Sequence, residues 1–117
     1  MAFLTPLRLE WIGVRVGRDR WCLLAPLRYR AESGDVYTVP DGYETDGESR
    51  PPLTMPLSGP PCTRSGVLHD WLGDRIGVPV EQAHALYREA LLSEGLDPVW
   101  AEQRFAAVSY WDQRTRA

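Results

Sequence analysis

The chain has 117 residues, of which 44% are hydrophobic and 25% are charged, and its formal net charge is −3. This length and composition predict a single globular domain over residues 1–117, and the aromatic residues spread along the chain exclude low-complexity disorder. The acidic balance argues against a nucleic-acid partner, and no apolar run reaches the roughly 18 residues of a membrane span.

Cysteine usage and the N-terminal residues bear on the compartment. Cys22 and Cys62 are isolated, with no CxxC pair, and we expect them to be thiols in a cytoplasmic protein, although their spacing leaves a disulfide open. The first residues lack the charged stretch, apolar block and cleavage site of a signal peptide. A cytoplasmic or virion-associated location is therefore the expectation.

The first 44 residues have the pattern of β-strands. Apolar and polar residues alternate over 7–11 and 27–30, and β-branched and aromatic residues fill 36–39. Glycine-containing turn sequences lie at 32–35 and 40–42. We predict an antiparallel meander of four or five short strands.

Residues 45–61 have a different character, because five prolines and several glycines fall in or beside them. This composition excludes regular structure, and irregular segments of this length in compact domains are often functional. The apolar Leu53, Met55 and Leu57 are expected to pack against the body of the domain. We predict an ordered, wrapping loop.

Residues 62–114 have the pattern of three helices. The first is expected to begin at Thr63 or Ser65 and to run to about Leu72, with Gly73 and Gly77 ending it. Pro79 opens the second, and Asp97 caps the third. Apolar stripes on the helices and strands predict that the following residues are buried: Trp21, Trp71, Trp100, Phe105, Val108 and Trp111. Trp11 ends a strand and is expected to be exposed. Strands followed by helices indicate an α+β fold with the helices packed on the sheet.

The residues able to do chemistry gather around the junction of the loop and the helices. His69 and Asp70 share the first helix, His84 lies on the inward face of the second, and Asp46 begins the loop. Imidazoles with carboxylates suit Zn, Mn or Fe, and a bound metal would activate water for hydrolysis. One hypothesis is therefore a mononuclear metal site of His69, Asp70, His84 and Asp46, with Asp46 and Asp70 as catalytic groups.

A structural role for the same residues stays open. An inward histidine on an amphipathic helix is more often a hydrogen-bonded core residue than a ligand, and two histidines without HExxH spacing are a weak metal signal. Asp46 and Ser49 are also typical of turns that bond their own backbone. A triad of Ser49, His69 and an aspartate is disfavoured, because the GxSxG context is missing.

The motifs in order resemble those of a small phage and prophage family known as a domain of unknown function. Residues 37–51 are similar to its VPxGFxTDxxSxP segment, residues 69–72 to its HDxLY helix, and Ala83-His84 to its "AD" helix. Two positions depart from that pattern, since His84 stands where the family has Asp and Arg50 replaces a hydrophobic residue. Histidine and aspartate can both bind a metal, so this exchange is compatible with a metal site.

The resemblance implies a phage or prophage accessory protein without a settled activity, of the kind found in virion-assembly or lysis modules. Two hypotheses follow. The first is a hydrolase-like protein with the divalent metal site, in which Thr45, Ser49 and Arg50 bind the substrate. The second is a non-catalytic virion-assembly or interaction module with protein partners, in which the polar cluster fastens the loop to the helices.

Overall fold

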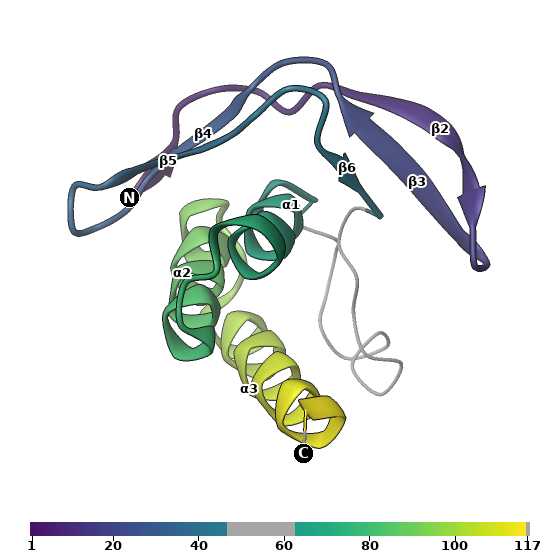
Figure 1. The fold of residues 1–117 in the computed structure, drawn as a ribbon. Coiled ribbons are helices and arrows are strands. Elements are labelled where there is room, and N and C mark those ends of the chain that lie inside the picture. Colours follow the sequence, from purple (N-terminus) through teal and green to yellow (C-terminus); the bar gives the residue numbers. More distant parts are fainter. Residues whose placement is uncertain (47–62, 117) are drawn as a thin grey trace.

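The protein is an α+β structure in which the helices lie on one side of a curved layer of strands (Figure 1). The computed structural model describes residues 1–46 and 63–116, and the side chains among them other than those of residues 75–76 and 110–116. Ser49, Arg50, Cys62 and most of the Pro-rich segment thus lie outside the described residues, as does the side chain of Trp111. Cys22 is a half-buried free thiol.

The strands form two antiparallel sheets of three strands each. The first has the order β1 (Ala2–Phe3), β4 (Leu27–Arg30), β5 (Val36–Val39), with Tyr29 paired to both Phe3 and Tyr37. Alternation is clear on β4, where Leu27 and Tyr29 are buried and the arginines between them are exposed.

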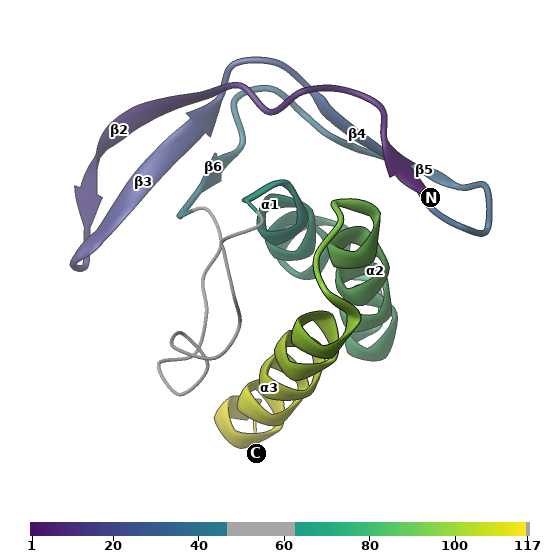
Figure 2. The same cartoon turned by 180° about the vertical axis from the view of Figure 1, so that it is seen from behind.

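The second sheet has the order β2 (Leu9–Arg15), β3 (Arg18–Leu23), β6 (Glu44–Thr45). The β2–β3 hairpin extends beyond the helices, as both views show (Figure 2). Its two-residue turn has positive φ at Val16 (52°) and at Gly17 (74°), as a tight hairpin turn requires.

The predicted antiparallel strands and three C-terminal helices are confirmed, but the strand order is not that of a simple meander. The chain crosses between the sheets, so β1 joins β4 and β6 joins β3. Both added strands have only two residues, which is too short for a periodic signal in the sequence.

The helices are α1 (Thr63–Trp71), α2 (Val80–Ser93) and α3 (Pro98–Arg116). The α-helix ends at Trp71, close to the expected Leu72. A π-helical turn, η2 (Leu72–Ile76), then continues the chain to Gly77, the second of the two glycines expected to end the helix. Gly77 has a left-handed backbone (φ 68°), where a glycine is favoured because it has no Cβ. This added turn places Gly73, Asp74 and Gly77 beside the cavity described below.

The main core lies between the sheets and the helices α1 and α2, and a second cluster joins α2 to α3. Trp71 is buried as predicted and Val108 packs in the second cluster, but Trp100 is 40% exposed. The predicted burial of Trp100 is therefore wrong, and Trp11 is exposed as expected. Residue 100 is near the start of α3, where Ala101 takes the inward position.

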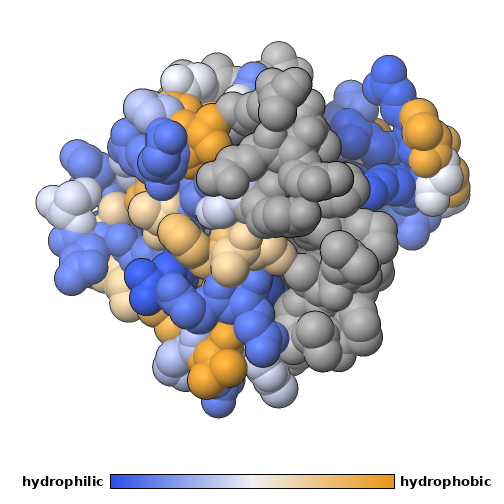
Figure 3. Space-filling model, turned by 90° about the horizontal axis from the view of Figure 1, so that it is seen from below, coloured by the Kyte–Doolittle hydropathy of each residue, from blue (hydrophilic) through white to orange (hydrophobic). Residues whose placement is uncertain are grey.

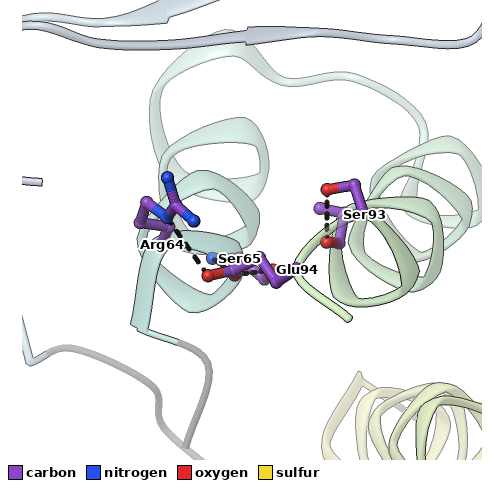
Figure 4. Close-up of polar contacts among 5 residues, drawn as sticks. Arg64, Ser65, Ser93 and Glu94 are labelled. Atoms are coloured by element: carbon purple, nitrogen blue, oxygen red, sulfur yellow. Dashed lines mark hydrogen bonds and ion pairs between the residues drawn. The ribbon is translucent and has the colours of Figure 1, made fainter. Parts of the chain in front are cut away.

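A carboxylate at the end of α2 holds the start of α1 (Figure 4). Glu94 Oε1 accepts hydrogen bonds from the Ser65 backbone N–H at 3.0 Å and from the Ser65 hydroxyl, and Glu94 Oε2 pairs with Arg64 Nε at 3.2 Å. An acidic group here satisfies a free N–H of the first helical turn and complements the helix dipole. This contact fixes α1, and with it His69 and Asp70, relative to α2.

Among the helices that the structure describes, none combines the length and apolarity needed to cross a membrane.

Candidate functional site

A cavity of about 590 Å³ lies between the second sheet, α1, η2 and α2. Thirteen of the described residues line it, including both histidines and four acidic side chains: Arg20, Tyr43, Glu44, Asp46, His69, Asp70, Gly73, Asp74, Gly77, Val78, Val80, Ala83 and His84. Three predicted elements therefore meet at one place, namely the start of the loop segment and the first two helices.

The strand β6 brings one carboxylate and one hydroxyl to α1. Thr45 is buried and its Oγ1 donates a hydrogen bond to Asp70 Oδ2 at 3.2 Å. The next residue, Asp46, pairs through Oδ2 with Arg18 Nη1 at 3.2 Å, and its other carboxylate oxygen is buried. Apart from the Asp70 carboxyl group discussed next, the described residues supply no N–H or O–H donor to that second oxygen.

Asp46 and Asp70 lie within hydrogen-bonding reach of each other. Burial, followed by the nearby Asp46 charge, raises the pKa of Asp70 from 3.8 to about 7, and the Thr45 hydrogen bond opposes this only in part. A hydrogen bond between two carboxyl groups requires a proton on one of them, because two carboxylates have no donor. The pair is thus arranged to hold one proton near neutral pH.

His69 and His84 form the second pair of the cavity. His69 Nε2 and His84 Nδ1 are 3.0 Å apart, and the ring centroids are 5.1 Å apart. His84 is only 4% exposed, which confirms its predicted inward position. One nitrogen of this bond must donate and the other accept, so the two rings cannot both be imidazolium in this geometry.

The four candidate metal ligands are therefore in one cavity but form two separate pairs. Among the described residues, no three side chains of His, Cys, Asp or Glu are grouped so that they could hold one metal ion. The metal site of His69, Asp70, His84 and Asp46 stays a prediction, and it requires these side chains to turn toward a common point.

Several lining residues were not predicted from the sequence. Arg20 contributes a buried Nε for which the described residues offer no acceptor, while Glu44 and Asp74 add acidic groups to the wall. Arg20 and Glu44 come together because β6 pairs with β3, a long-range contact without a signal in the sequence. Asp74 reaches the cavity because η2 continues the helical chain past Leu72, and a π-helical turn has no signal in the sequence pattern.

The fold and the cavity define a small α+β protein with a polar, strongly acidic pocket at the sheet–helix junction. The chain belongs to the DUF1353 family, described as proteins of unknown function, whose model matches residues 21–108. That range contains every described residue that lines the cavity except Arg20, which immediately precedes it.

An uncharacterized protein, y4iH, from Sinorhizobium fredii is 36% identical to this chain over 69 residues. The match covers 56% of this chain and 29% of that protein, so the chain corresponds to under a third of its relative. No solved structure matches this chain.

Proposed function

We propose that this DUF1353 protein is a small hydrolase-like enzyme whose acid–base groups are Asp46 and Asp70. The observation that carries this proposal is the convergence of two carboxyl groups and two imidazoles on one cavity. A proton held between two carboxyl groups can be given to a leaving group, while the other carboxylate accepts a proton from water.

The surroundings of this pair support the assignment. Arg18 fixes the orientation of Asp46, and Thr45 fixes that of Asp70, so both groups are positioned before a ligand arrives. Arg20, the one guanidinium among the described residues that line this cavity, is available to an anionic part of a substrate. Ser49, Arg50 and Thr45 complete the proposed binding residues, of which only Thr45 is among the described ones.

A divalent metal, Zn, Mn or Fe, is a second route to hydrolysis at the same residues. It is favoured by the donor set of two imidazoles and two carboxylates within one cavity. Metal analysis of the untagged wild-type protein and of His69→Ala separates the routes: near-stoichiometric metal that the variant loses supports the metal-dependent reaction.

The proposed enzyme is tested with chromogenic esters, phosphate esters and glycosides, before and after treatment with a chelator. Asp70→Asn and Asp46→Asn should each abolish turnover, because each removes one member of the proton-sharing pair. Glu102→Gln is the matched control, since Glu102 is an exposed carboxylate outside the cavity, and it should retain full activity. Turnover that survives in Asp70→Asn would contradict the assignment.

The alternative function is a non-catalytic virion-assembly or protein-interaction module, for which the same bonds are structural. The Thr45–Asp70 and Arg18–Asp46 contacts favour it, because they tie β6 to α1 and to β3. The phage or prophage setting, with protein partners and a cytoplasmic or virion-associated location, is supported by the motif resemblance alone. Proteins co-purified from a phage-infected culture, compared between wild type and Asp46→Asn, would identify such a partner.

A further inference from the structure

The outer edge of the second sheet carries exposed apolar side chains. Among the described strands, β2 is an edge strand, hydrogen-bonded to β3 on one side. Trp11 is 53% exposed and Val14 is 66% exposed, on a hairpin that extends away from the helices. The space-filling view shows apolar surface on this projecting part, at its right-hand end (Figure 3). Exposed apolar edge strands are templates for pairing with another chain.

An irregularity in β2 places its residues in two chemically distinct rows. The register shifts between Trp11 and Gly13, so Trp11 pairs with Trp21 and Val14 pairs with Asp19. Trp21 and Asp19 are two residues apart on β3 and share a face, so Trp11 and Val14 share it too. The hydrogen bond from Trp11 Nε1 to Asp19 Oδ1, at 3.0 Å, agrees with this placement.

The charged residues of β2 share the opposite face. Glu10 pairs with Cys22 and Arg15 pairs with Arg18, and these two partners are on the same side of β3. Without the extra residue at the bulge, positions 11 and 14 would point to opposite faces, as would positions 10 and 15.

This order makes β2 complementary to a second copy of itself. When two copies lie antiparallel about the point between Ile12 and Gly13, Trp11 of each faces Val14 of the other on one face. On the other face, Glu10 of each copy then faces Arg15 of the other. A two-fold axis repeats every contact, so one dimer contains two apolar pairs and two ion pairs.

The monomer leaves these charges without complementary partners. No described residue forms an ion pair with Glu10 or Arg15, and Arg15 sits directly opposite Arg18, which is a repulsive cross-strand pair. Arg18 is balanced by Asp46, whereas Glu10 of a second copy would balance Arg15.

We propose that the β2 strands of two copies of this chain pair antiparallel, forming a two-fold dimer with Trp11 against Val14 and Glu10 against Arg15. The dimer joins the two second sheets into one. Each β2 meets its counterpart on the side away from β3. A single strand pair is a small interface, so the dimer belongs to the weak, reversible class.

The test uses two charge reversals, each of which should weaken the dimer alone, whereas the two together should restore it. In Glu10→Arg every ion pair becomes Arg against Arg, and in Arg15→Glu every one becomes Glu against Glu. Each variant should raise the dimer dissociation constant at least about tenfold, since like charges across an interface repel. An equimolar mixture should form heterodimers, because the introduced arginine then faces the introduced glutamate, and the unchanged Arg15 of one variant faces the unchanged Glu10 of the other.

Sedimentation velocity from about 1 µM to about 1 mM protein covers the range of a weak dimer. The double variant Glu10→Arg/Arg15→Glu should dimerise like the wild type. Arg28→Glu, on β4, is the matched control, because it changes the net charge as Arg15→Glu does and leaves β2 intact. Circular dichroism and urea unfolding of each variant establish that it is folded.

Two results would overturn the proposal. A wild-type protein that stays monomeric at the highest concentration shows that the bulge keeps this edge from pairing. A wild-type dimer that both single reversals leave unchanged places the interface elsewhere on the surface.

Discussion

Replacing Asp70 with Asn should stabilise the protein at alkaline pH. Asp70 is buried beside Asp46, and its pKa is raised from 3.8 to about 7. Asparagine is nearly isosteric and its amide oxygen still accepts the hydrogen bond from Thr45. The variant therefore removes an ionisable group from the cavity wall and keeps the packing.

The direction follows from proton binding. A folded-state pKa above the unfolded value means that the folded protein binds more protons between about pH 4 and pH 7. The contribution of Asp70 to stability is thus fully present below about pH 4 and is lost as the pH rises through about 7. The shift corresponds to a loss on the order of 4 kcal/mol once the group is ionised, as an upper limit.

The assay is urea unfolding of wild type and Asp70→Asn at about pH 5 and about pH 8, either side of the raised pKa. Other ionisable groups line the same cavity, so the quantity to compare is the difference in unfolding free energy between the two proteins at each pH. These groups face Asp70 in both proteins: Glu44, Asp46, His69, Asp74 and His84. We expect the variant to gain about 2 kcal/mol relative to wild type between the two pH values, because part of the full change already occurs between pH 4 and pH 5.

A gain near zero would refute the reasoning, because it would mean that Asp70 ionises in the folded protein as easily as in the unfolded chain. Asp46→Asn provides an independent check. It removes the charge that opposes ionisation of Asp70, so the pH dependence should become smaller but should not vanish, since burial is the larger cause.

Four further substitutions test the fold, each by its urea unfolding midpoint. Glu94→Ala should cost about 2 to 3 kcal/mol, because it leaves the buried Ser65 N–H without its acceptor; an unchanged midpoint would show that water replaces the carboxylate. Leu68→Ala should cost about 2 to 5 kcal/mol, since Leu68 is completely buried in the main core, and a smaller loss would mean that the core collapses around the site. Asp97→Ala should cost about 1 kcal/mol, because the Asp97 side chain accepts a hydrogen bond from the Val99 N–H at the start of α3. An unchanged midpoint would show that this cap does not stabilise the protein. Val16→Asn should stabilise the protein by about 1 kcal/mol, since Val16 is 94% exposed and has a positive φ that asparagine tolerates better. A less stable variant would contradict this, because it would mean that the Val16 side chain makes a stabilising contact.

The elements with strong local signals could be predicted from the sequence. Alternation identifies β4, and Asp97 followed by proline identifies the start of α3 because the capping bond is local. Val108 is buried as predicted, whereas Trp100 is exposed because the first turn of α3 presents Ala101 inward instead. Which residues of a helix face inward depends on how the helix packs against its neighbour, and the spacing of its apolar residues alone does not determine this.

Some of the residues that line the cavity could be predicted to lie together, but their arrangement could not. Asp46, Asp70, His69 and His84 were expected together, and they do line one cavity. Their division into a carboxyl pair and an imidazole pair depends on β6, a two-residue strand that pairs with a strand more than twenty positions earlier. No local pattern specifies the β3–β6 pairing, because it is stabilised by long-range contacts. These are the hydrogen bond from Thr45 to Asp70 and the packing of Tyr43 in the main core.

Asp70 also bears on the choice between the catalytic and the structural hypothesis. A residue that only fastens β6 to α1 needs one acceptor for Thr45, and an asparagine would provide it without a cost on ionisation. Among the described residues, no cationic group lowers the pKa of Asp70, and the charge that raises it most is that of another carboxylate, Asp46. A buried carboxyl group whose pKa is raised toward neutrality is typical of acid–base sites, and a contact that only binds Thr45 does not need one. If Asp70→Asn is more stable than wild type at alkaline pH and loses turnover, the structural hypothesis fails. If the variant is more stable but the wild type turns over no substrate, we assign the destabilising Asp70 carboxylate to ligand binding.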